Sequence, residues 1–378
     1  MQYNDNMENI YQTKGESLTE QFRDAGRLFA IKIQASVRKI GRKRSRLINI
    51  RREVAERTWN HLQNVTEAKE FCECLRAWSE GAGVNPEQAM WCIADNLSGC
   101  QTLMARYQSG VVLLHSEEEF RDNPNMELHM TKPHTMEFRV GGETLKTLVY
   151  NDLLPGAGLY GWKDDMMVAV DSLFLREDGI ESVESPLLAN VVSWLVWRMH
   201  PSEAEASRIA GLAGSLGELV DGYVLNVVRR IEGKVEGYKL TLARSEHRVE
   251  YLGGKPGDYL RQVNIVDPRY PKMNWALPPK NIWRGGYKYF TRRLQTMDTH
   301  MAQYGHLCNQ SLSLDIVAKT HELIQEILYS DLRESYVNID MGAMCVGMLD
   351  LRLRTSVSCR LNDGKIPGVI EYLDRSIE

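Results

Sequence analysis

The spacing of hydrophobic residues changes at Cys100, and this change constrains the fold more than any other feature of the chain. Between residues 16 and 98 apolar residues recur every three or four positions, which predicts helix through this region. From Cys100 onward, strand-forming residues fill positions 103–107 and 111–115 with a Ser-Gly turn between them, which predicts a β-hairpin. We therefore expect a helical N-terminal region followed by a β-rich remainder that begins at Cys100.

The same two spacings continue to the end of the chain. Alternating segments separated by turn residues predict strands, and segments with a period of three to four predict helices. Strands are expected at residues 134–140, 144–150, 166–175, 223–228, 235–242, 343–350 and 352–360, and helices after Ser185-Pro186, from residue 283 and at 314–328. The expected fold class is therefore α+β.

Composition is typical of a globular protein with a sizeable core. The chain has 378 residues, of which 43% are hydrophobic and 25% are charged. The net charge of −4 and the pI near 6.2 argue against bulk binding to nucleic acid or to an anionic membrane, because proteins that bind either usually carry an excess of basic residues. No stretch approaches about 18 consecutive apolar residues and the first residues are polar, so we expect a cytoplasmic protein.

The cysteines suggest neither a disulfide framework nor a metal site. There are seven of them, an odd number, which favours a reducing compartment. None has the C-x-x-C spacing with histidines that a zinc site would show. We therefore expect no metal and no bound cofactor.

The one concentrated basic run is RKIGRKRSRLINIRR, residues 38–52. Such a run can bind RNA or phosphate, including the phosphates of an acyl-CoA. It can equally be a solvated helix face or an inhibitory flap over an acidic site, and the absence of interleaved aromatic residues favours this second interpretation. No nucleic-acid partner is therefore expected.

Gly99-Cys100 is the candidate for chemistry. The carbonyl of a glycine is unhindered and a thiol is a strong nucleophile at neutral pH, so a cysteine directly after a glycine at the start of a strand suits self-cleavage of the bond between them. Once that bond is cut, the α-amine of the new N-terminal cysteine can act as a general base. The alternative is an inert cysteine in the core.

The sequence before this bond resembles a known family. Residues 75–100, LRAWSEGAGVNPEQAMWCIADNLSGC, are similar to the end of the prosegment in the autoproteolytic acyltransferase family C45, the acyl-CoA:6-aminopenicillanic acid acyltransferase-like group, whose members read E-x-x-G-x-AEGAG, then a helix, then GCT. Ser79 stands where that family has alanine, and Gln101 stands where it has threonine.

The resemblance implies the N-terminal-nucleophile hydrolase fold, a four-layer αββα sandwich. It also implies a division of the chain. Residues 1–99 would form a helical prosegment, retained as the small subunit after self-cleavage, and residues 100–378 would form the catalytic large subunit.

The resemblance further implies two partners for Cys100. Glu118, or Glu119 with a shift of one residue, corresponds to an aspartate that interacts with the N-terminal cysteine, although three consecutive glutamates can also be a solvated loop. Asn264 corresponds to an asparagine that donates a hydrogen bond to the oxyanion, although a turn asparagine before an Asp-Pro pair has the same appearance.

Substrate contacts are expected from further residues. Asp171 replaces an asparagine of the family, and it can recognise an amine or another cationic group of the substrate or make a local structural hydrogen bond. Arg284, Arg292 and Arg293 lie near the point where the family often carries a substrate-binding arginine, and each can also be surface charge.

The reaction implied by the resemblance begins with attack of Cys100 on the Gly99 carbonyl, followed by hydrolysis that frees the amine of Cys100. The thiol then carries an acyl group as a thioester and passes it to a small amine, as an acyltransferase does, or to water, as an amidohydrolase acting on linear C–N amide bonds does. Expected partners are a small-molecule acyl donor, with acyl-CoA as a candidate substrate, the chain's own prosegment, and further copies in a homo-oligomer.

Two alternatives remain at this stage. The first is an unprocessed, non-catalytic family member that serves as a binding or scaffold protein, which the departures from the family pattern favour. The second is a nucleic-acid-associated protein that uses the basic run.

Overall fold

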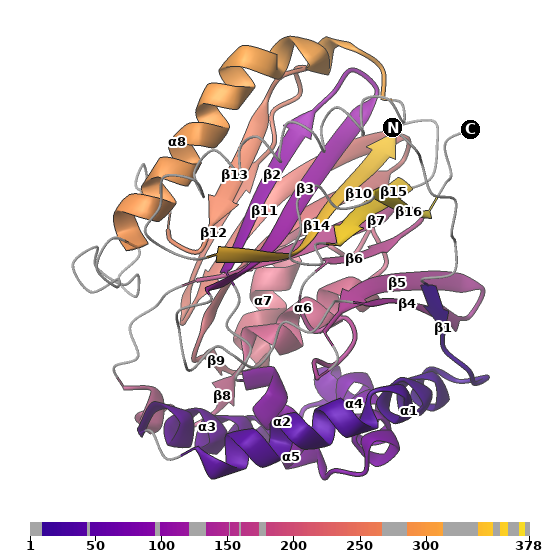
Figure 1. Cartoon of the computed structure of the whole chain (residues 1–378), viewed down its shortest axis with the longest axis vertical. Helices are drawn as coiled ribbons and strands as arrows, with labels where there is room; N and C mark the ends of the chain where they lie inside the picture. The colour runs from indigo at the N-terminus through magenta and orange to yellow at the C-terminus, as the bar shows by residue number, and fades with distance from the viewer. Residues whose placement is uncertain are drawn as a thin grey trace.

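Two β-sheets lie face to face in the computed structural model, with helices outside them (Figure 1). The structure describes residues 10–43, 46–94, 99–120, 134–150, 152–158, 160–173, 179–266, 286–312, 339–350, 356–361 and 370–374. For Leu47, Gly99, residues 117–120, residues 286–289 and the described residues from 339 onward, only the backbone is described. The α+β class expected from the sequence is confirmed.

The larger sheet has eight strands in the order β1-β4-β5-β6-β7-β10-β11-β12. They are β1 (Ile10–Gln12), β4 (His134–Val140), β5 (Glu143–Val149), β6 (Tyr160–Lys163), β7 (Met166–Ser172), β10 (Gly222–Ile231), β11 (Lys234–Ala243) and β12 (Glu246–Tyr251). All neighbouring strands are antiparallel except β1 and β4, which are parallel. The N-terminal segment therefore adds the edge strand to a sheet built otherwise from the chain after Cys100.

The smaller sheet has six antiparallel strands in the order β13-β2-β3-β14-β15-β16. They are β13 (Tyr259–Val263), β2 (Gly99–Arg106), β3 (Gly110–Phe120), β14 (Ile339–Asp350), β15 (Ser356–Leu361) and β16 (Ile370–Asp374). The hairpin expected at Cys100 is confirmed as β2 and β3. The helix expected at 314–328 lies outside the described residues.

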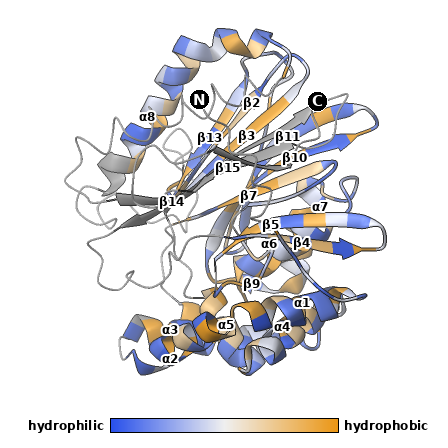
Figure 2. Cartoon of the chain, turned by 45° about the vertical axis from the view of Figure 1, so that its right-hand side comes forward, coloured by the Kyte–Doolittle hydropathy of each residue, from blue (hydrophilic) through white to orange (hydrophobic). Residues whose placement is uncertain are grey.

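In the described residues before Cys100, five α-helices form a layer below the sheets in Figure 1. They are α1 (Leu18–Leu28), α2 (Ala30–Arg42), α3 (Arg46–Leu62), α4 (Lys69–Ala82) and α5 (Pro86–Ala94). The expectation of helix throughout residues 16–98 is wrong at the turns. Gly83, at a φ of 69°, ends α4 in the left-handed conformation, and Pro86 begins α5. Hydrophobic and hydrophilic residues alternate along these helices (Figure 2), as expected of helices with one buried face.

The segment that carries the family resemblance is the place where α4 crosses α1. A Cβ atom added to Gly81 would lie 2.1 Å from the carbonyl oxygen of Arg23, and one added to Gly26 would lie 2.1 Å from that of Trp78. Glycine is therefore required at both positions for the two helix backbones to touch. Glu80 pairs with Arg23 at 2.8 Å beside the crossing. The residues Glu80 to Gly83 thus have a packing role in this chain.

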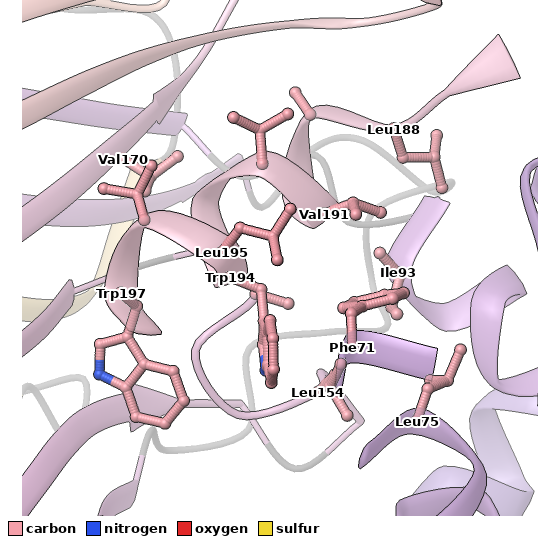
Figure 3. Close-up of a cluster of buried hydrophobic side chains, with 14 of the residues drawn as sticks. Phe71, Leu75, Ile93, Leu154, Val170, Leu188, Val191, Trp194, Leu195 and Trp197 are labelled. Atoms are coloured by element: carbon pink, nitrogen blue, oxygen red, sulfur yellow. The ribbon is translucent and has the colours of Figure 1, made fainter. Parts of the chain in front are cut away.

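The segments before and after Cys100 share one hydrophobic core. Helices α6 (Ala189–Arg198) and α7 (Ala206–Leu216) lie between α1–α5 and the eight-stranded sheet. Figure 3 shows Phe71 and Leu75 of α4 near Trp194 of α6, and the rings of Phe71 and Trp194 meet edge to face at 5.5 Å. Burial of such large side chains favours the folded state by about 2 kcal/mol each, so the N-terminal helices belong to the same cooperative unit as the sheets.

One more helix, α8 (Gly286–Tyr304), packs along β13 on the six-stranded sheet. Asp298 of α8 accepts hydrogen bonds from the Tyr259 hydroxyl at 2.7 Å and from Arg261 at 2.5 and 2.7 Å. The remaining short elements include a parallel strand pair, β8 (Pro186–Leu187) and β9 (Glu218–Leu219). None of the helices in the described part of the chain has both the length and the apolar character needed to cross a membrane.

Candidate active site

Cys100 is the second residue of β2, and its side chain faces the space between the sheets. Side chains on a strand alternate between the two faces, so Cys100, Thr102 and Met104 share one face. Thr102 donates a hydrogen bond to Asp171 of the eight-stranded sheet, and Met104 packs in a cluster with residues of that sheet, so the shared face is the inner one. Cys100 is only 2% exposed. The candidate nucleophile therefore lies inside the sandwich.

Asn264 holds the backbone nitrogen of Cys100. The Cys100 N–H donates to Asn264 Oδ1 at 2.9 Å, and Asn264 Nδ2 donates to the carbonyl oxygen of Ser172 at 2.9 Å and to its hydroxyl at 3.1 Å. The orientation of the amide follows from these partners, because a backbone N–H can only donate and a backbone carbonyl can only accept. Asn264 is fully buried and directly follows β13, the neighbour of β2. It therefore joins the ends of β2, β13 and β7.

A chain of hydrogen bonds crosses from one sheet to the other two residues away from Cys100. Thr102 Oγ1 lies 2.9 Å from His115 Nδ1 and donates to Asp171 Oδ2 at 2.7 Å. Asn226 Nδ2 donates to the same carboxylate oxygen at 2.6 Å. All four side chains are buried. When Asp171 is ionised, the single hydroxyl proton of Thr102 goes to its carboxylate. In that state His115 must donate its Nδ1–H to Thr102.

Strand register explains why these four residues meet. Thr102 and His115 are directly opposite each other in the β2–β3 hairpin. Asp171 and Asn226 are diagonal neighbours on β7 and β10, because Asp171 pairs with Val224 and Asn226 with Ala169. Stacking of the two sheets then brings one pair over the other. We name the set Thr102, His115, Asp171 and Asn226 the polar network.

The residues expected from the sequence fall into three groups. The structure brings Cys100, Asn264 and Asp171 together. Asp171 is fully buried with its Oδ2 bonded to Thr102 and Asn226, which is the local structural bond among the alternatives open for it. Glu118 is the register partner of Gly99 across β2 and β3, and Glu119 follows it, but the side chains of both lie outside the described part.

The arginines expected at the substrate are less informative. Arg284 lies outside the described residues. Arg292 and Arg293 are on α8, the first exposed and the second buried. Their helix packs along β13, so its position is compatible with the region around Asn264.

Thr102, His115, Asn226 and Ser172 were not singled out from the sequence. A usable signal was present, because each of the first three is a polar residue two positions from an apolar residue on the same face of its strand, Met104, Leu113 and Val228 respectively. Ser172 could not be found this way, because it contacts Asn264 from a distance of 92 residues along the chain.

Three other described cysteines are buried and have thiols with a raised pKa. Burial raises the pKa of the Cys72 thiol to about 11 and also raises the pKa of the Cys74 and Cys308 thiols. Their thiols are therefore protonated near neutral pH and are poor nucleophiles. The five cysteines whose side chains are described form no disulfide, and no three His, Cys, Asp or Glu side chains within the described ranges are arranged to hold a metal ion.

Residues of the basic run line a surface groove on α2, and one of its arginines packs on a tryptophan of α5. Arg38, Lys39, Arg42 and Lys43 line an open groove of about 430 Å³ on α2. Farther along, the Arg52 guanidinium lies 5.6 Å from the centre of the Trp91 ring, as a cation–π pair. In the described part of this run, Arg38 and Arg42 are thus exposed, whereas Arg52 packs on Trp91.

No protein-family model matches this chain, and no curated protein matches it either.

Proposed function

We propose that the chain is an autoproteolytic cysteine enzyme of the N-terminal-nucleophile type that cleaves itself at Gly99-Cys100 and then transfers acyl groups through Cys100. The observation that carries this proposal is the hydrogen bond from the Cys100 N–H to Asn264 Oδ1, 2.9 Å long, at the buried start of an inner strand. This nitrogen is the one that self-cleavage would convert into a free amine, and a specific side chain already holds it.

The self-cleavage step conserves atoms and charge. The Cys100 sulfur, after losing its proton, bonds to the Gly99 carbonyl carbon, and the C–N bond between Gly99 and Cys100 breaks as the nitrogen takes up a proton. Water then attacks the Gly99 thioester, which releases the Gly99 carboxylate and restores the thiol. Cys100 is left with a thiol and an α-amine on the same residue.

In turnover the new α-amine takes the thiol proton, and the thiolate accepts an acyl group from an amide or thioester donor, with acyl-CoA as a candidate. The acyl group then leaves to a small amine or to water. Asn264 Oδ1 can accept from the nitrogen both as an amide and as an amine, so it would keep the lone pair of the amine directed away from Asn264 in the mature enzyme. The oxyanion role expected for Asn264 would require Nδ2 to exchange Ser172 for the substrate oxygen.

The fold supports the proposal in a coarse way. A four-layer αββα arrangement needs two facing sheets with helices on both outer sides. Helices α6 and α7 outside the eight-stranded sheet and α8 beside the six-stranded sheet are compatible with it. The contacts of Asp171 favour a structural role over recognition of a cationic substrate group. None of the proposed steps requires a metal or a bound cofactor.

The test is the size of the purified protein. Self-cleavage divides the 43.2 kDa chain into pieces of about 11 and 32 kDa, and N-terminal sequencing of the larger piece begins Cys-Gln-Thr. Cys100→Ala stays whole, and Cys308→Ala, a change at another buried cysteine, is processed like the wild type. Acyl-CoA and N-acyl amine panels then reveal the donor by an acyl mass increase on the larger piece.

An intact wild-type chain with an unreactive Cys100 thiol would overturn the proposal. That result would favour the alternative of an unprocessed binding or scaffold protein, which the burial of Cys100 at 2% exposure makes worth testing.

A further inference from the structure

Self-cleavage needs a base other than the one that serves turnover. The α-amine that serves as the base in turnover exists only after the Gly99-Cys100 bond has been cut. Before the cut, the same nitrogen is part of an amide, whose lone pair is delocalised and not basic. Another group must therefore accept the thiol proton in the first step.

We propose that His115, held by Thr102 and Asp171, accepts the Cys100 proton during self-cleavage. This inference rests on the proposed function and adds to it a base that acts before the amine is free. His115 gains the proton and becomes an imidazolium, Cys100 becomes a thiolate that attacks Gly99, and the proton passes from the imidazolium to the departing nitrogen. His115 is neutral again after the step.

Register places His115 within reach of Cys100. The residue directly opposite Cys100 is Glu117, and His115 is two positions away on the same strand, so Cys100 and His115 are diagonal neighbours. Diagonal neighbours in an antiparallel pair are about 7 to 8 Å apart, which a ring side chain can span directly or through one water. Thr102 and His115, being opposite each other, share the inner face with Cys100.

The polar network prepares His115 for this role. Thr102 accepts the Nδ1–H of His115 and donates to Asp171, so the carboxylate acts on the imidazole through one hydroxyl. A carboxylate in this position holds the ring in one tautomer and stabilises the imidazolium when it forms. Asn226 gives the carboxylate a second donor, which offsets part of the cost of burying its charge. Thr102, Asp171 and Asn226 are thus positioning residues.

Charged and titratable side chains near His115 affect the pH at which its ring gains or loses a proton. Among the described side chains, they include Cys100 on β2, Asp171 on β7, Tyr160 on β6 with its ring centre 6.2 Å from that of His115, and Lys239 on β11 opposite Asn226. Lys239 pairs with Glu250 at 2.8 Å, so its charge is balanced. Across β14 the register partner of His115 is Cys345, for which only the backbone is described.

The test is the rate of self-cleavage of freshly synthesised precursor between pH 5 and 9. In the wild type the rate rises with pH as the imidazole loses its proton. His115→Asn keeps a donor for Thr102 but cannot accept a proton, and we expect a loss of about 100-fold together with loss of that rise. His61→Asn, at a histidine on α3 that contacts the Leu216 carbonyl, keeps the wild-type profile.

The hydroxyl relay has its own matched pair of variants. Thr102→Val removes the relay and lowers the rate, and Thr102→Ser, which keeps a hydroxyl, recovers most of it. A His115→Asn precursor that folds and cleaves at the wild-type rate at every pH would overturn the inference while leaving the proposed function intact. A wild-type chain that never cleaves would overturn the proposed function itself.

A second measurement does not depend on cleavage or on the stability of the His115 variant. In uncut Cys100→Ala protein, nitrogen NMR of labelled histidines reports which ring nitrogen carries the proton. We expect the His115 signal to show a protonated Nδ1, and Asp171→Asn to change it. A neutral His115 with its proton on Nε2 in the Cys100→Ala protein would contradict the inference.

Discussion

In the space between the two sheets, the strands β2, β3, β7 and β10 each carry an apolar residue and, two positions away, a polar one, and we call these two levels the apolar half and the polar half. In the apolar half, Met104 of β2 and Leu113 of β3 pack against Ala169 of β7 and Val228 of β10. The members of the polar network lie two positions away on each strand, on the same face, toward one end of the sandwich. They are Thr102, His115, Asp171 and Asn226. On these four strands, the change from apolar to polar therefore occurs at one level.

This comparison separates the half that stabilises the fold from the half that we propose for chemistry. Apolar packing between sheets stabilises the fold by about 25 cal/mol per Å² of buried surface, whereas buried polar groups contribute little net stability even when they are fully hydrogen-bonded. A fold does not need four polar side chains between its sheets. Residues that break the local pattern in this way are expected at functional sites, and Cys100 is the next residue beyond Thr102 on the same face of β2.

The largest expected effect is on stability in the apolar half. Leu113→Ala leaves a cavity where a fully buried side chain was, and we expect a loss of about 3 kcal/mol in the free energy of unfolding, measured with urea. Leu28→Ala, at a leucine that is 44% exposed, should change stability by less than about 0.5 kcal/mol. The folded fraction of Leu113→Ala should still cleave at the wild-type rate. A large loss of that rate would show that the apolar half also contributes to self-cleavage.

A buried carboxyl outside the polar half, that of Asp221, should make the stability of the protein depend on pH, and this effect can be measured separately from the polar half. Burial raises the pKa of Asp221 from 3.8 to about 6, against the opposing effects of the Ala189 N–H, which donates to it at 2.7 Å, and of Arg51. A carboxyl whose pKa is raised by folding favours the folded state while protonated, fully below pH 3.8, and this contribution is lost as the pH rises through about 6. The loss is about 3 kcal/mol.

Asp221→Asn keeps an oxygen for the Ala189 N–H and removes the titration. Between pH 4 and 7, the free energy of unfolding should fall with rising pH when Asp221 is present and should fall much less in the Asp221→Asn variant. Urea titrations in the Cys100→Ala background measure both. The slope that remains reports the other titrating groups. An unchanged slope would mean that Asp221 titrates normally.

Loss of Asn264 is expected to cost less stability but more activity. Asn264→Ala leaves the buried Cys100 N–H and the Ser172 carbonyl without this partner, and we expect a loss of about 2 kcal/mol in the free energy of unfolding. Self-cleavage should fall by at least about 10-fold, because the scissile nitrogen is no longer held. Asn60→Ala, at an exposed asparagine on α3, is the matched control, and an equal loss in both variants would argue against a special role for Asn264.

The smallest expected effect is that of Thr102→Ser. The hydroxyl and both of its hydrogen bonds remain, and only one buried methyl group is lost, so the free energy of unfolding should fall by about 1 kcal/mol. Thermal unfolding of the Cys100→Ala background measures this change. A much larger loss would show that the threonine methyl, rather than the hydrogen-bond chain, is what the polar half depends on.

Much of the local structure could be predicted from the sequence. The β2–β3 hairpin, the β10–β11 hairpin and the strand at 134–140 follow the expected spacing, because alternation along a strand depends on neighbouring residues only. The turns between the N-terminal helices were missed although Gly83 and Pro86 marked one of them. The periodic pattern on either side outweighed these signals.

The candidate site could be predicted only in part. Cys100 and Asn264 were found through their local patterns and the resemblance, but the contact between them joins residues 164 positions apart. The sequence places His115 at the end of a hairpin strand and leaves Asp171 as either a substrate contact or a local structural hydrogen bond. Their connection through Thr102 depends on how one sheet is stacked on the other, which no local pattern encodes.

By itself, the amino-acid order determined where helix changes to strand, which residues face inward on each strand, and that a glycine and a cysteine stand at the change. Only the tertiary structure decided which inward residues meet. Period and turn chemistry are set by a few adjacent backbone angles, whereas the contacts of Cys100 with Asn264 and of Thr102 with Asp171 arise from the stacking and register of strands that are distant in the chain.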